Sequence, residues 1–456
     1  AAFVGESKDN ETRTRISRGR YTKKLVRMTA DMETQLMLPS IIATFELNVR
    51  RYGQRRLFTW LSSKCHEEAT LTFSQLQAKA CAVCIALRLR WGIAVRERAL
   101  LIYPPGLEFI AGFLGCQYAE VISVPYYPPV FPTSLLPSPT SRKLLDEGLA
   151  KVYRIVQSCT PVVILSCRSY MLAKSIASTR LLGALDWPAL PTYSTSDLLS
   201  ISKAPREHQE WLPQQIARRS EPAAEGEIAF LQFTSGSTGH PKGVMVGTRH
   251  VLANVLALWQ CCTGDKERRD WLQLCQNDNI AVVNWVPQYH DMGLIGNIMQ
   301  PLLLAVRGDL LDPLSFIQRP VCWLEAITRL AHSHRVISSA PNFAFALCVR
   351  KVTKEERACL DFNHVLCVMN GAEPIRASTL RDFESAFGPY GFRRSMWLPC
   401  LGIAENVVYV AGRPGEPVVA WLDRSQLAVN ERPLLPSAAQ HATESVGLEI
   451  LQPSIA

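Results

Sequence analysis

The stretch ALLIYPPGLEFIAGFLGCQYAEVISV, residues 99–124, is the most informative part of the chain for the class of fold. It opens with a short apolar run, continues with a helical pattern from Gly106 to Ala119, and closes with a second apolar run from Val121 to Val124. Short apolar runs that alternate with helical segments predict buried parallel strands covered by helices. The stretch is therefore expected to form the centre of a parallel α/β unit.

The flanking segments continue this alternation. On the N-terminal side, Thr72 can cap a helix that runs to about Arg90. On the C-terminal side, a helix is expected over residues 142–158 and a strand over residues 162–165. This βαβαβ order predicts a doubly wound α/β fold. The connecting segment PYYPPVFPTSLLPSPTS, residues 125–141, is too rich in proline for a helix and is expected to be a surface loop.

A second α/β unit is expected after a polar, proline-containing link at residues 182–226. We therefore expect two doubly wound α/β subdomains, at residues 37–220 and 221–411, with the nucleotide site in the second, and an incomplete β-rich third subdomain at 412–456. The strands expected in the second subdomain are 228–233, 280–285, 335–338, 365–369 and 395–398, and its helices lie near 248–258, 293–304, 315–331 and 377–387.

The composition is that of a folded protein with more than one core, because 48% of the 456 residues are hydrophobic and 20% are charged. Much of the net charge of +9 lies in a basic leader at residues 1–36, which is expected to be disordered. Its basic run lacks interleaved aromatic residues and is accompanied by acidic ones, which disfavours binding to nucleic acid. A remnant of an organellar targeting peptide stays an alternative.

The fourteen cysteines predict reduced thiols and a cytoplasmic location. Cys81 and Cys84 form a CxxC pattern, but they lie within a helical pattern and have no second pair at zinc-ribbon spacing. Most of the cysteines are therefore expected to fill the core. No apolar stretch reaches the ~18 residues of a membrane span, so none is expected.

The strongest chemical signal is TSGSTGHPKG, residues 234–243, which follows the apolar strand ending at Phe233 and is expected to precede a helix. Small and hydroxyl residues let N–H and O–H groups converge on phosphate oxygens, and Lys242 adds a positive charge. The loop is not a Walker A loop, because Gly243 stands where Ser or Thr would be needed. A flexible glycine-serine turn is the alternative.

Four further segments each follow or end a predicted strand, which is where open α/β sheets build ligand sites. Taken singly, each has a structural alternative, since His290 can be a buried histidine with satisfied hydrogen bonds and Glu373 a charge at a helix N-terminus. The four segments are PQYHDMGLIG (287–296), SAPNFAF (339–345), NGAEPIR (370–376) and LPCLGIAEN (398–406).

Together, these segments resemble the acyl-adenylate-forming superfamily, and the fatty acyl-AMP ligases in particular, over about residues 38–415. The superfamily signature is TSGSTGHPKG with Gly402, Ala404 and Glu405, and the ligase likeness rests on longer phrases such as WVPQYHDMGLIGNIMQPLL (285–303). The resemblance implies an enzyme that uses ATP and Mg²⁺ to activate a fatty acid as acyl-AMP, releases pyrophosphate, and passes the acyl group to an acyl carrier protein of a polyketide or peptide synthase.

The resemblance also implies roles by position. Lys242, His290 and Glu405 are the expected catalytic residues, with His290 beside the carboxylate and Glu405 and Thr238 holding magnesium. The expected phosphate-binding residues are Thr234, Ser235, Gly236, Ser237, Thr238, Gly239 and Lys242. Those expected at the adenine are Asn370, Gly371, Ala372, Glu373, Leu401 and Gly402. An acyl tunnel is expected along Leu294, Ile295, Phe343 and Phe345, with ordinary core packing as the alternative.

Two departures from the family pattern qualify these expectations. Leu401 stands where the family usually has an aromatic residue that stacks on adenine. The family also continues with a ribose-binding aspartate, a hinge and a domain with a catalytic lysine, so a C-terminally truncated chain of impaired activity is expected. The open alternatives are an acyl-CoA synthetase and a degenerate module that binds nucleotide or lipid, while a P-loop NTPase is disfavoured.

Overall fold

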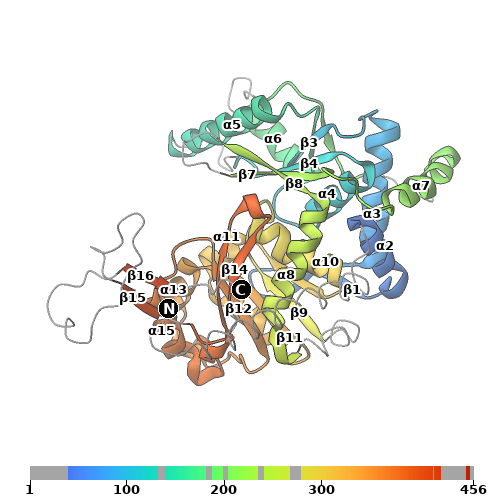
Figure 1. Ribbon diagram of the computed structural model, residues 1–456. Coiled ribbons are helices and arrows are strands. Elements are labelled where there is room, and N and C mark those ends of the chain that lie inside the picture. The colour runs from blue at the N-terminus through green and yellow to red at the C-terminus, as the bar shows by residue number, and fades with distance from the viewer. Residues whose placement is uncertain are drawn as a thin grey trace.

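The protein, seen here as a computed structural model, has two lobes that lie side by side, each built on its own sheet (Figure 1). The helices α2 and α3 lie where the lobes meet. The residues that the structure describes are 40–131, 139–180, 187–198, 204–234, 241–267, 279–413, 415–417, 419–422 and 448–451.

The first lobe contains a six-stranded sheet in the order β6-β5-β3-β4-β7-β8. All neighbours are parallel except β7 and β8, which form an antiparallel pair. The predicted strand–helix alternation around residues 99–124 is confirmed here. The strands are β3 (Arg98–Ile102), β4 (Ile122–Tyr126), β5 (Val163–Ser166), β6 (Thr192–Ser194), β7 (Ile228–Thr234) and β8 (Lys242–Gly247).

The three helices predicted in this lobe begin within a few residues of the predicted positions, whereas those at residues 168–180 and 206–219 lie in segments where no helix is predicted. Thr72 caps α3 in a capping box with Gln75, as its sequence position predicts. Helix α5 begins at Pro139, inside the segment expected to be a loop, because proline is well tolerated in the first turn of a helix. The helices are α3 (Phe73–Ile85), continued by the π-helix η1 (Ala86–Arg90), α4 (Leu107–Ala119), α5 (Pro139–Cys159), α6 (Arg168–Arg180) and α7 (Arg206–Arg219).

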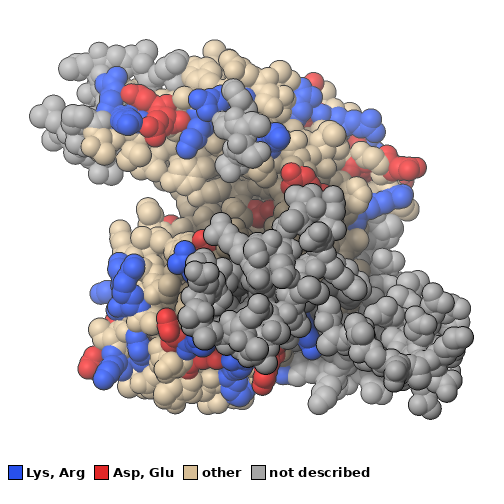
Figure 2. Space-filling view, turned by 60° about the vertical axis from the view of Figure 1, so that its left-hand side comes forward, with Lys and Arg blue, Asp and Glu red and all other residues tan. Residues whose placement is uncertain are grey.

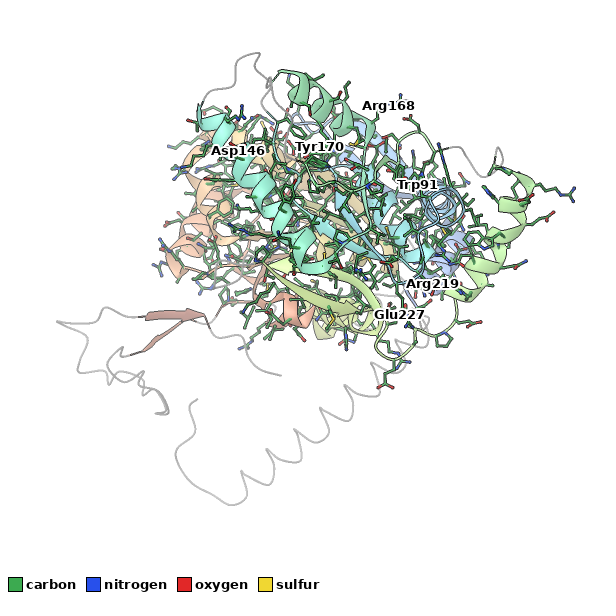
Figure 3. All side chains as sticks on the ribbon, turned by 90° about the horizontal axis from the view of Figure 1, so that it is seen from above. Trp91, Asp146, Arg168, Tyr170, Arg219 and Glu227 are labelled. Atoms are coloured by element: carbon green, nitrogen blue, oxygen red, sulfur yellow. The ribbon has the colours of Figure 1, made fainter. Side chains whose placement is uncertain are left out.

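An ion pair joins α7 to the start of β7. The guanidinium of Arg219 lies 3.0 Å from the Glu227 carboxylate, and the Thr248 hydroxyl donates to the same carboxylate at 2.9 Å. Figure 3 shows Arg219 and Glu227 close together on this side of the lobe. Burial by itself raises the pKa of Glu227, but these partners outweigh it and hold the pKa below the ordinary 4.5.

The second lobe contains an eight-stranded sheet in the order β14-β13-β12-β11-β9-β10-β1-β2. Its central pairs are parallel, and the edge strands β14 and β2 pair antiparallel with their neighbours. The strands are β1 (Arg56–Leu61), β2 (Glu67–Thr72), β9 (Ile280–Asn284), β10 (Arg307–Leu311), β11 (Arg335–Pro341), β12 (Val365–Gly371), β13 (Trp397–Gly402) and β14 (Tyr409–Gly412).

The helix predicted over residues 315–331 is two helices, because Pro320 has no N–H with which to continue the first one. A separate antiparallel pair, β15 (Val419–Leu422) and β16 (Leu448–Leu451), falls within the expected incomplete third subdomain, and the existence of that subdomain stays a prediction. The remaining helices are α2 (Ile41–Tyr52), α8 (Thr248–Glu267), π-helix η3 (Met292–Met299), α10 (Gln300–Leu304), α11 (Pro313–Gln318), α12 (Val321–Ala331), α13 (Asn342–Lys351), α14 (Lys354–Arg357), α15 (Ala377–Phe387), and the 3₁₀ turns η4 (Gly388–Tyr390), η5 (Arg394–Met396) and η6 (Ala404–Asn406).

The sheets do not follow the expected division at residue 220. Strand β7, which the sequence assigns to the second subdomain, pairs with β4 through Ser123 and Phe230 and so belongs to the first sheet. Strands β1 and β2, from the N-terminal part, lie in the second sheet. A strand can join a parallel sheet at either edge, wherever the strand lies in the sequence. The order of strands along the chain therefore does not reveal which sheet each strand belongs to. The 234–243 loop also leads into β8 and not directly into a helix.

The core confirms the expected role of the cysteines. All thirteen cysteines in the described residues are free and ten are buried, including Cys81 and Cys84 on α3. No helix in this part of the chain is long and apolar enough to cross a membrane.

Candidate functional site

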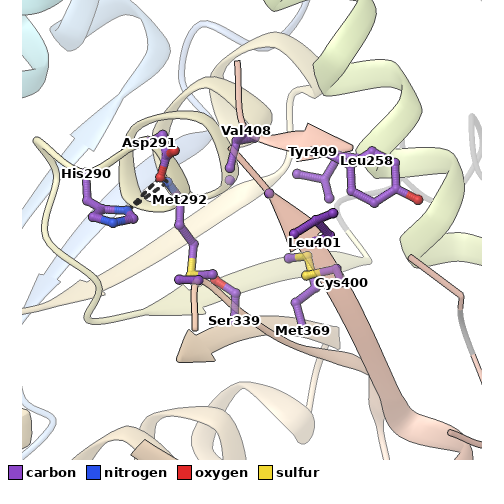
Figure 4. Close-up of a pocket in the computed structure, with 13 residues that line it drawn as sticks. Leu258, His290, Asp291, Met292, Ser339, Met369, Cys400, Leu401, Val408 and Tyr409 are labelled. Atoms are coloured by element: carbon purple, nitrogen blue, oxygen red, sulfur yellow. Dashed lines mark hydrogen bonds and ion pairs between the residues drawn. The ribbon is translucent and has the colours of Figure 1, made fainter. Parts of the chain in front are cut away.

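A pocket of about 150 Å³ lies at the carboxyl ends of β11, β12 and β13 (Figure 4). This edge of a parallel sheet is where α/β proteins place their ligands. Residues from the turn after β9, from η3, from α8 and from the start of β14 complete its walls. The lining residues are Leu258, His290, Asp291, Met292, Gly296, Ser339, Met369, Ala372, Cys400, Leu401, Gly402, Val408 and Tyr409.

The pocket brings together the four strand-end segments singled out in the sequence. His290 comes from the first segment, Ser339 from the second, Ala372 from the third, and Leu401 and Gly402 from the fourth. Of the residues assigned to the site by resemblance, His290, Ala372, Leu401 and Gly402 line the pocket. The segments are separated in sequence, so the folded sheet is what makes them one site.

His290 forms a pair with its neighbour Asp291 at the pocket wall. Nδ1 of His290 lies 2.7 Å from Oδ1 of Asp291, and the same oxygen accepts the backbone N–H of Met292 at 2.6 Å. The His290 side chain is 51% exposed, so the alternative of a buried histidine is wrong. Partial shielding from water at the pocket wall lowers the pKa of His290, but the hydrogen bond and charge of Asp291 outweigh it and raise the pKa above the ordinary 6.5.

The turn that carries this pair requires glycine at one position. A Cβ atom on Gly293 would lie 2.0 Å from the carbonyl oxygen of Pro287, which no side chain can tolerate. Asp291 is the N-cap of the π-helix η3, in which every residue is buried. Irregular helices of this kind are frequent at functional sites. The turn and the helix together fix the side chains that face the pocket.

The NGAEPIR segment contributes one residue to the pocket and two to the surrounding framework. Ala372 lines the pocket with a backbone φ of 64°. Asn370 is fully buried, and its Nδ2 lies 3.4 Å from Oδ1 of Asn342. Glu373 accepts the backbone N–H of Phe343 at 2.5 Å, so its carboxylate caps the first turn of α13. Glu373 is therefore a negative charge at a helix N-terminus, as the alternative interpretation of its segment predicts.

The fourth segment ends in a strained turn just after Glu405. Val407 has φ 69° and ψ −64°, and the N–H of Val408 donates to the Asn406 carbonyl at 2.8 Å, which together define a γ-turn. Such a conformation is rare for a β-branched residue and costs on the order of 1–3 kcal/mol. Glu405 itself is exposed and forms no hydrogen bond or ion pair with the other described residues.

Lys242 and Thr234 face each other across the hairpin of β7 and β8. Lys242 is exposed, and its strand β8 packs against η6, the turn that carries Glu405. The expected cation and the expected metal ligand therefore sit on neighbouring elements. Ser235, Gly236, Ser237, Thr238 and Gly239, all assigned to the phosphates, lie outside the described residues.

The expected acyl-tunnel residues are mostly core residues. Leu294, Ile295 and Phe345 are fully buried in the hydrophobic clusters and do not line the pocket. The ring of Phe345 packs 4.9 Å from that of Trp397, as core packing predicts. Phe343 is 43% exposed and likewise lies outside the pocket lining. Core packing is therefore the correct interpretation for the three buried residues.

Sequence reasoning missed several pocket residues. Leu258, on α8, and Tyr409, on β14, belong to no segment that carried a signal. Met369 lies in β12 immediately before Asn370, the first residue of the NGAEPIR segment. This position next to a strand-end segment is the one sequence signal that points to Met369. Among the described residues, no group of three or more His, Cys, Asp or Glu side chains could hold a metal ion.

Figure 2 shows the surface hollowed between the two lobes, with acidic and basic residues interspersed on the face it displays.

The fold and the pocket define an α/β protein that builds a ligand site from strand-end turns, next to a hairpin loop rich in small and hydroxyl residues. The sequence profile described as AMP-binding enzyme matches residues 45–421, and the chain belongs to this family.

The chain is similar to proteins that are named as fatty-acid ligases. It is 32% identical over 357 residues to the medium-chain-fatty-acid–[acyl-carrier-protein] ligase JamA of Moorena producens, covering 78% of this chain and 53% of that protein. It is 35% identical over 387 residues to the long-chain-fatty-acid–AMP ligase FadD26 of Mycobacterium marinum, covering 84% and 58%. The chain thus spans a little over half the length of these curated relatives.

A solved structure supports the same fold. The fatty acyl-adenylate ligase from L. pneumophila, in complex with acyl adenylate and pyrophosphate, is 30% identical with a TM-score of 0.70, covering 88% of this chain and 62% of that one. The adenylation domain of a keto acid-selecting NRPS module has a TM-score of 0.66 at 17% identity, which bears on the fold alone. The predicted α/β architecture of an adenylate-forming enzyme is confirmed.

Proposed function

We propose that this protein activates a fatty acid with ATP and Mg²⁺ as an acyl-adenylate and passes the acyl group to an acyl carrier protein. The observation that carries the proposal is the pocket, in which the apolar side chains of Leu258, Met292 and Met369 lie in one cavity with His290 and the turns at Ala372 and Gly402. The apolar side chains suit an acyl chain, whereas His290 and the two turns suit a carboxylate and a nucleotide.

The proposed reaction needs no nucleophile from the protein. A carboxylate oxygen of the fatty acid attacks the α-phosphorus of ATP, an O–P bond forms, the bond to the bridging oxygen of the β-phosphate breaks, and pyrophosphate leaves. The protein must align two anions and offset their repulsion. His290, whose pKa is raised beside Asp291, would present at the pocket wall an imidazole that takes up a proton more readily than an ordinary histidine does. Lys242 would place a positive charge at the end of the phosphate loop.

The carboxylate of Glu405 fits a role as a magnesium ligand. It is exposed and has no other partner among the described residues, and Mg²⁺ prefers oxygen ligands. Because those residues offer no cluster of metal-binding side chains, phosphate and water oxygens would supply the rest, with Thr238 as the other expected protein ligand. Magnesium bound there would offset phosphate charge.

Leu401 and Gly402 are proposed to border the adenine. Leu401 is 50% exposed and offers an apolar face to the pocket, but no ring on which adenine can stack. A missing aromatic stack weakens binding by about 1 kcal/mol. A Cβ on Gly402 would lie 2.4 Å from the Val408 carbonyl oxygen, so glycine is needed for the pocket wall to keep its shape.

The names of relatives support an acyl carrier protein as the acceptor of the acyl group. JamA is named as a ligase to the acyl carrier protein and FadD26 as an AMP ligase. A third relative, 32% identical, is named as a putative fatty-acid–CoA ligase FadD21, so coenzyme A is the second candidate acceptor. A cytoplasmic site of action is proposed with either acceptor.

Fatty-acid-dependent exchange of labelled pyrophosphate into ATP tests the proposal. Exchange should appear with octanoic to hexadecanoic acid and be absent with acetate or free amino acids. Transfer is then followed by mass spectrometry with a carrier protein bearing phosphopantetheine, or with coenzyme A. Binding of ATP and fatty acid without any exchange would favour the degenerate binding module, and exchange with amino acids alone would reject the fatty-acid assignment.

A further inference from the structure

One glycine in the pocket wall stands beside empty space. Gly296 lies within η3, where every residue is buried, and it lines the pocket. Apart from the chain neighbours and the nearby backbone of its own helix, a Cβ atom added to Gly296 would meet no atom within 4 Å. A buried position normally has close neighbours on all sides, because protein interiors are densely packed. The space beside Gly296 is therefore part of the pocket itself.

The contrast with Gly293 shows that this is not a general property of the helix. Three residues earlier, a Cβ on Gly293 would lie 2.0 Å from the Pro287 carbonyl oxygen. Gly293 is required for the turn, whereas no contact in the described residues requires glycine at Gly296. The absence of a side chain at Gly296 therefore leaves space open in the cavity and is not required by the backbone conformation.

The open space lies at the apolar side of the pocket. Met292 and Gly296 are one π-helical turn apart, and both line the cavity. Helix α8, which packs against η3, supplies Leu258, and β12 supplies Met369. The residues assigned to the nucleotide, Ala372 and Leu401, come from other turns. Figure 4 shows Met292 and Met369 pointing into the same region of the pocket.

Resting on the proposed function, we infer that Gly296 is a specificity-determining residue, which keeps open the space that the acyl chain occupies and so sets the length of chain the enzyme accepts. A side chain at this position fills the cavity that methylene groups would otherwise enter. Acids longer than the remaining space lose affinity, while the nucleotide and the shortest acids still bind.

The test uses stable mimics of the acyl-adenylate, a series of acyl-sulfamoyladenosines from butanoyl to hexadecanoyl, with adenosine sulfamate as the head group alone. Affinities are measured by calorimetry for the unsubstituted protein and for Gly296→Ala, Gly296→Leu and Gly296→Phe. The unsubstituted protein should gain about fourfold in affinity per methylene until the pocket is full. Gly296→Ala should be tolerated, since its Cβ meets no neighbour.

Gly296→Leu and Gly296→Phe should bind adenosine sulfamate and the butanoyl compound normally, yet forfeit the gain of about fourfold in affinity for each methylene beyond the shortened pocket. Gly388→Leu is the matched control. Gly388 is exposed, has an ordinary helical backbone conformation, and likewise has no neighbour within 4 Å of a built Cβ. Circular dichroism checks that each variant folds, and the leucine variant gives the answer if the phenylalanine variant does not.

Two results overturn the inference in different ways. If both large variants keep the full chain-length dependence of the unsubstituted protein, Gly296 does not limit the acyl chain, although fatty-acid binding stands. If affinity in the unsubstituted protein does not change with chain length at all, the apolar side of the pocket does not bind acyl chains, and the fatty-acid part of the proposed function fails with the inference.

Discussion

The side-chain amide of Asn254 pairs with the backbone of Tyr409 in both directions. Its Nδ2 donates to the Tyr409 carbonyl at 2.8 Å, and its Oδ1 accepts the Tyr409 N–H at 3.0 Å. Asn254 lies on α8 and Tyr409 begins β14, so these bonds join a helix and an edge strand that both contribute to the pocket wall. They take the place of strand pairing at the free side of β14.

Replacing Asn254 with alanine should lower the free energy of unfolding by about 1–3 kcal/mol, because it leaves the Tyr409 N–H at the edge of the core without a partner and removes one of the two donors to the Tyr409 carbonyl. Urea denaturation measures this change. Asn406→Ala is the control, since Asn406 donates to the same Tyr409 carbonyl from an exposed position and should cost well under half as much. Equal losses would mean that the buried pair has no special role.

Replacing Lys242 or Glu405 with alanine should each weaken binding of ATP with magnesium. Lys242 would contact the phosphates, and Glu405 would hold the metal beside them, so losing either charge-assisted contact should cost about 1.5–3 kcal/mol, or roughly tenfold or more in affinity. Isothermal titration calorimetry with and without Mg²⁺ is the measurement. The Glu405 effect should shrink when magnesium is omitted, while the Lys242 effect should persist.

Lys79→Ala provides the comparison for a lost surface charge, because Lys79 is an exposed lysine on α3. Unchanged ATP affinity in both site variants would place the nucleotide elsewhere.

Replacing Asp291 with asparagine should lower the pKa of His290. Partial shielding from water then acts without the opposing carboxylate that raises the pKa above 6.5 in the unsubstituted protein. The imidazolium predominates below the folded pKa and is lost as the pH rises through it, so binding of a fatty acid should weaken over that range and do so at lower pH in the variant. Nitrogen-15 NMR titration of the imidazole reads this directly.

His66, exposed and on the far edge of the eight-stranded sheet, supplies the internal reference in the same spectra. A His290 titration that does not move in Asp291→Asn would show that the carboxylate does not set its charge.

Replacing Glu227 with glutamine should destabilise the protein at neutral pH but not in acid. Its partners, Arg219 first among them, hold the pKa of Glu227 below 4.5, so the stabilisation is present above 4.5 and disappears as the pH falls through the folded pKa. Unfolding in urea, measured at pH values above and below 4.5, should show the two proteins converging at low pH. A constant difference across that range would assign the effect to packing.

Much of the site could be predicted from the sequence because its parts are local. The strand ends stand out as apolar runs followed by small or polar residues, and the segments at these ends contain His290, Ala372, Leu401 and Gly402, which line the pocket. The resemblance places Glu373 at the adenine, which stays a prediction, and in the structure its carboxylate caps α13. A strand-end carboxylate has the same sequence signal in both roles, so the pattern alone does not separate them.

By itself, the sequence determined the local structure: the periodicity of residues 99–124 and the cap at Thr72 depend on neighbours a few positions away. Only the tertiary structure decided which sheet β7 joins, that Phe345 is core, and that Leu258 and Tyr409 meet the motif residues at one pocket. Those outcomes depend on long-range packing between segments far apart in the chain, and the void beside Gly296 exists only once that packing is complete.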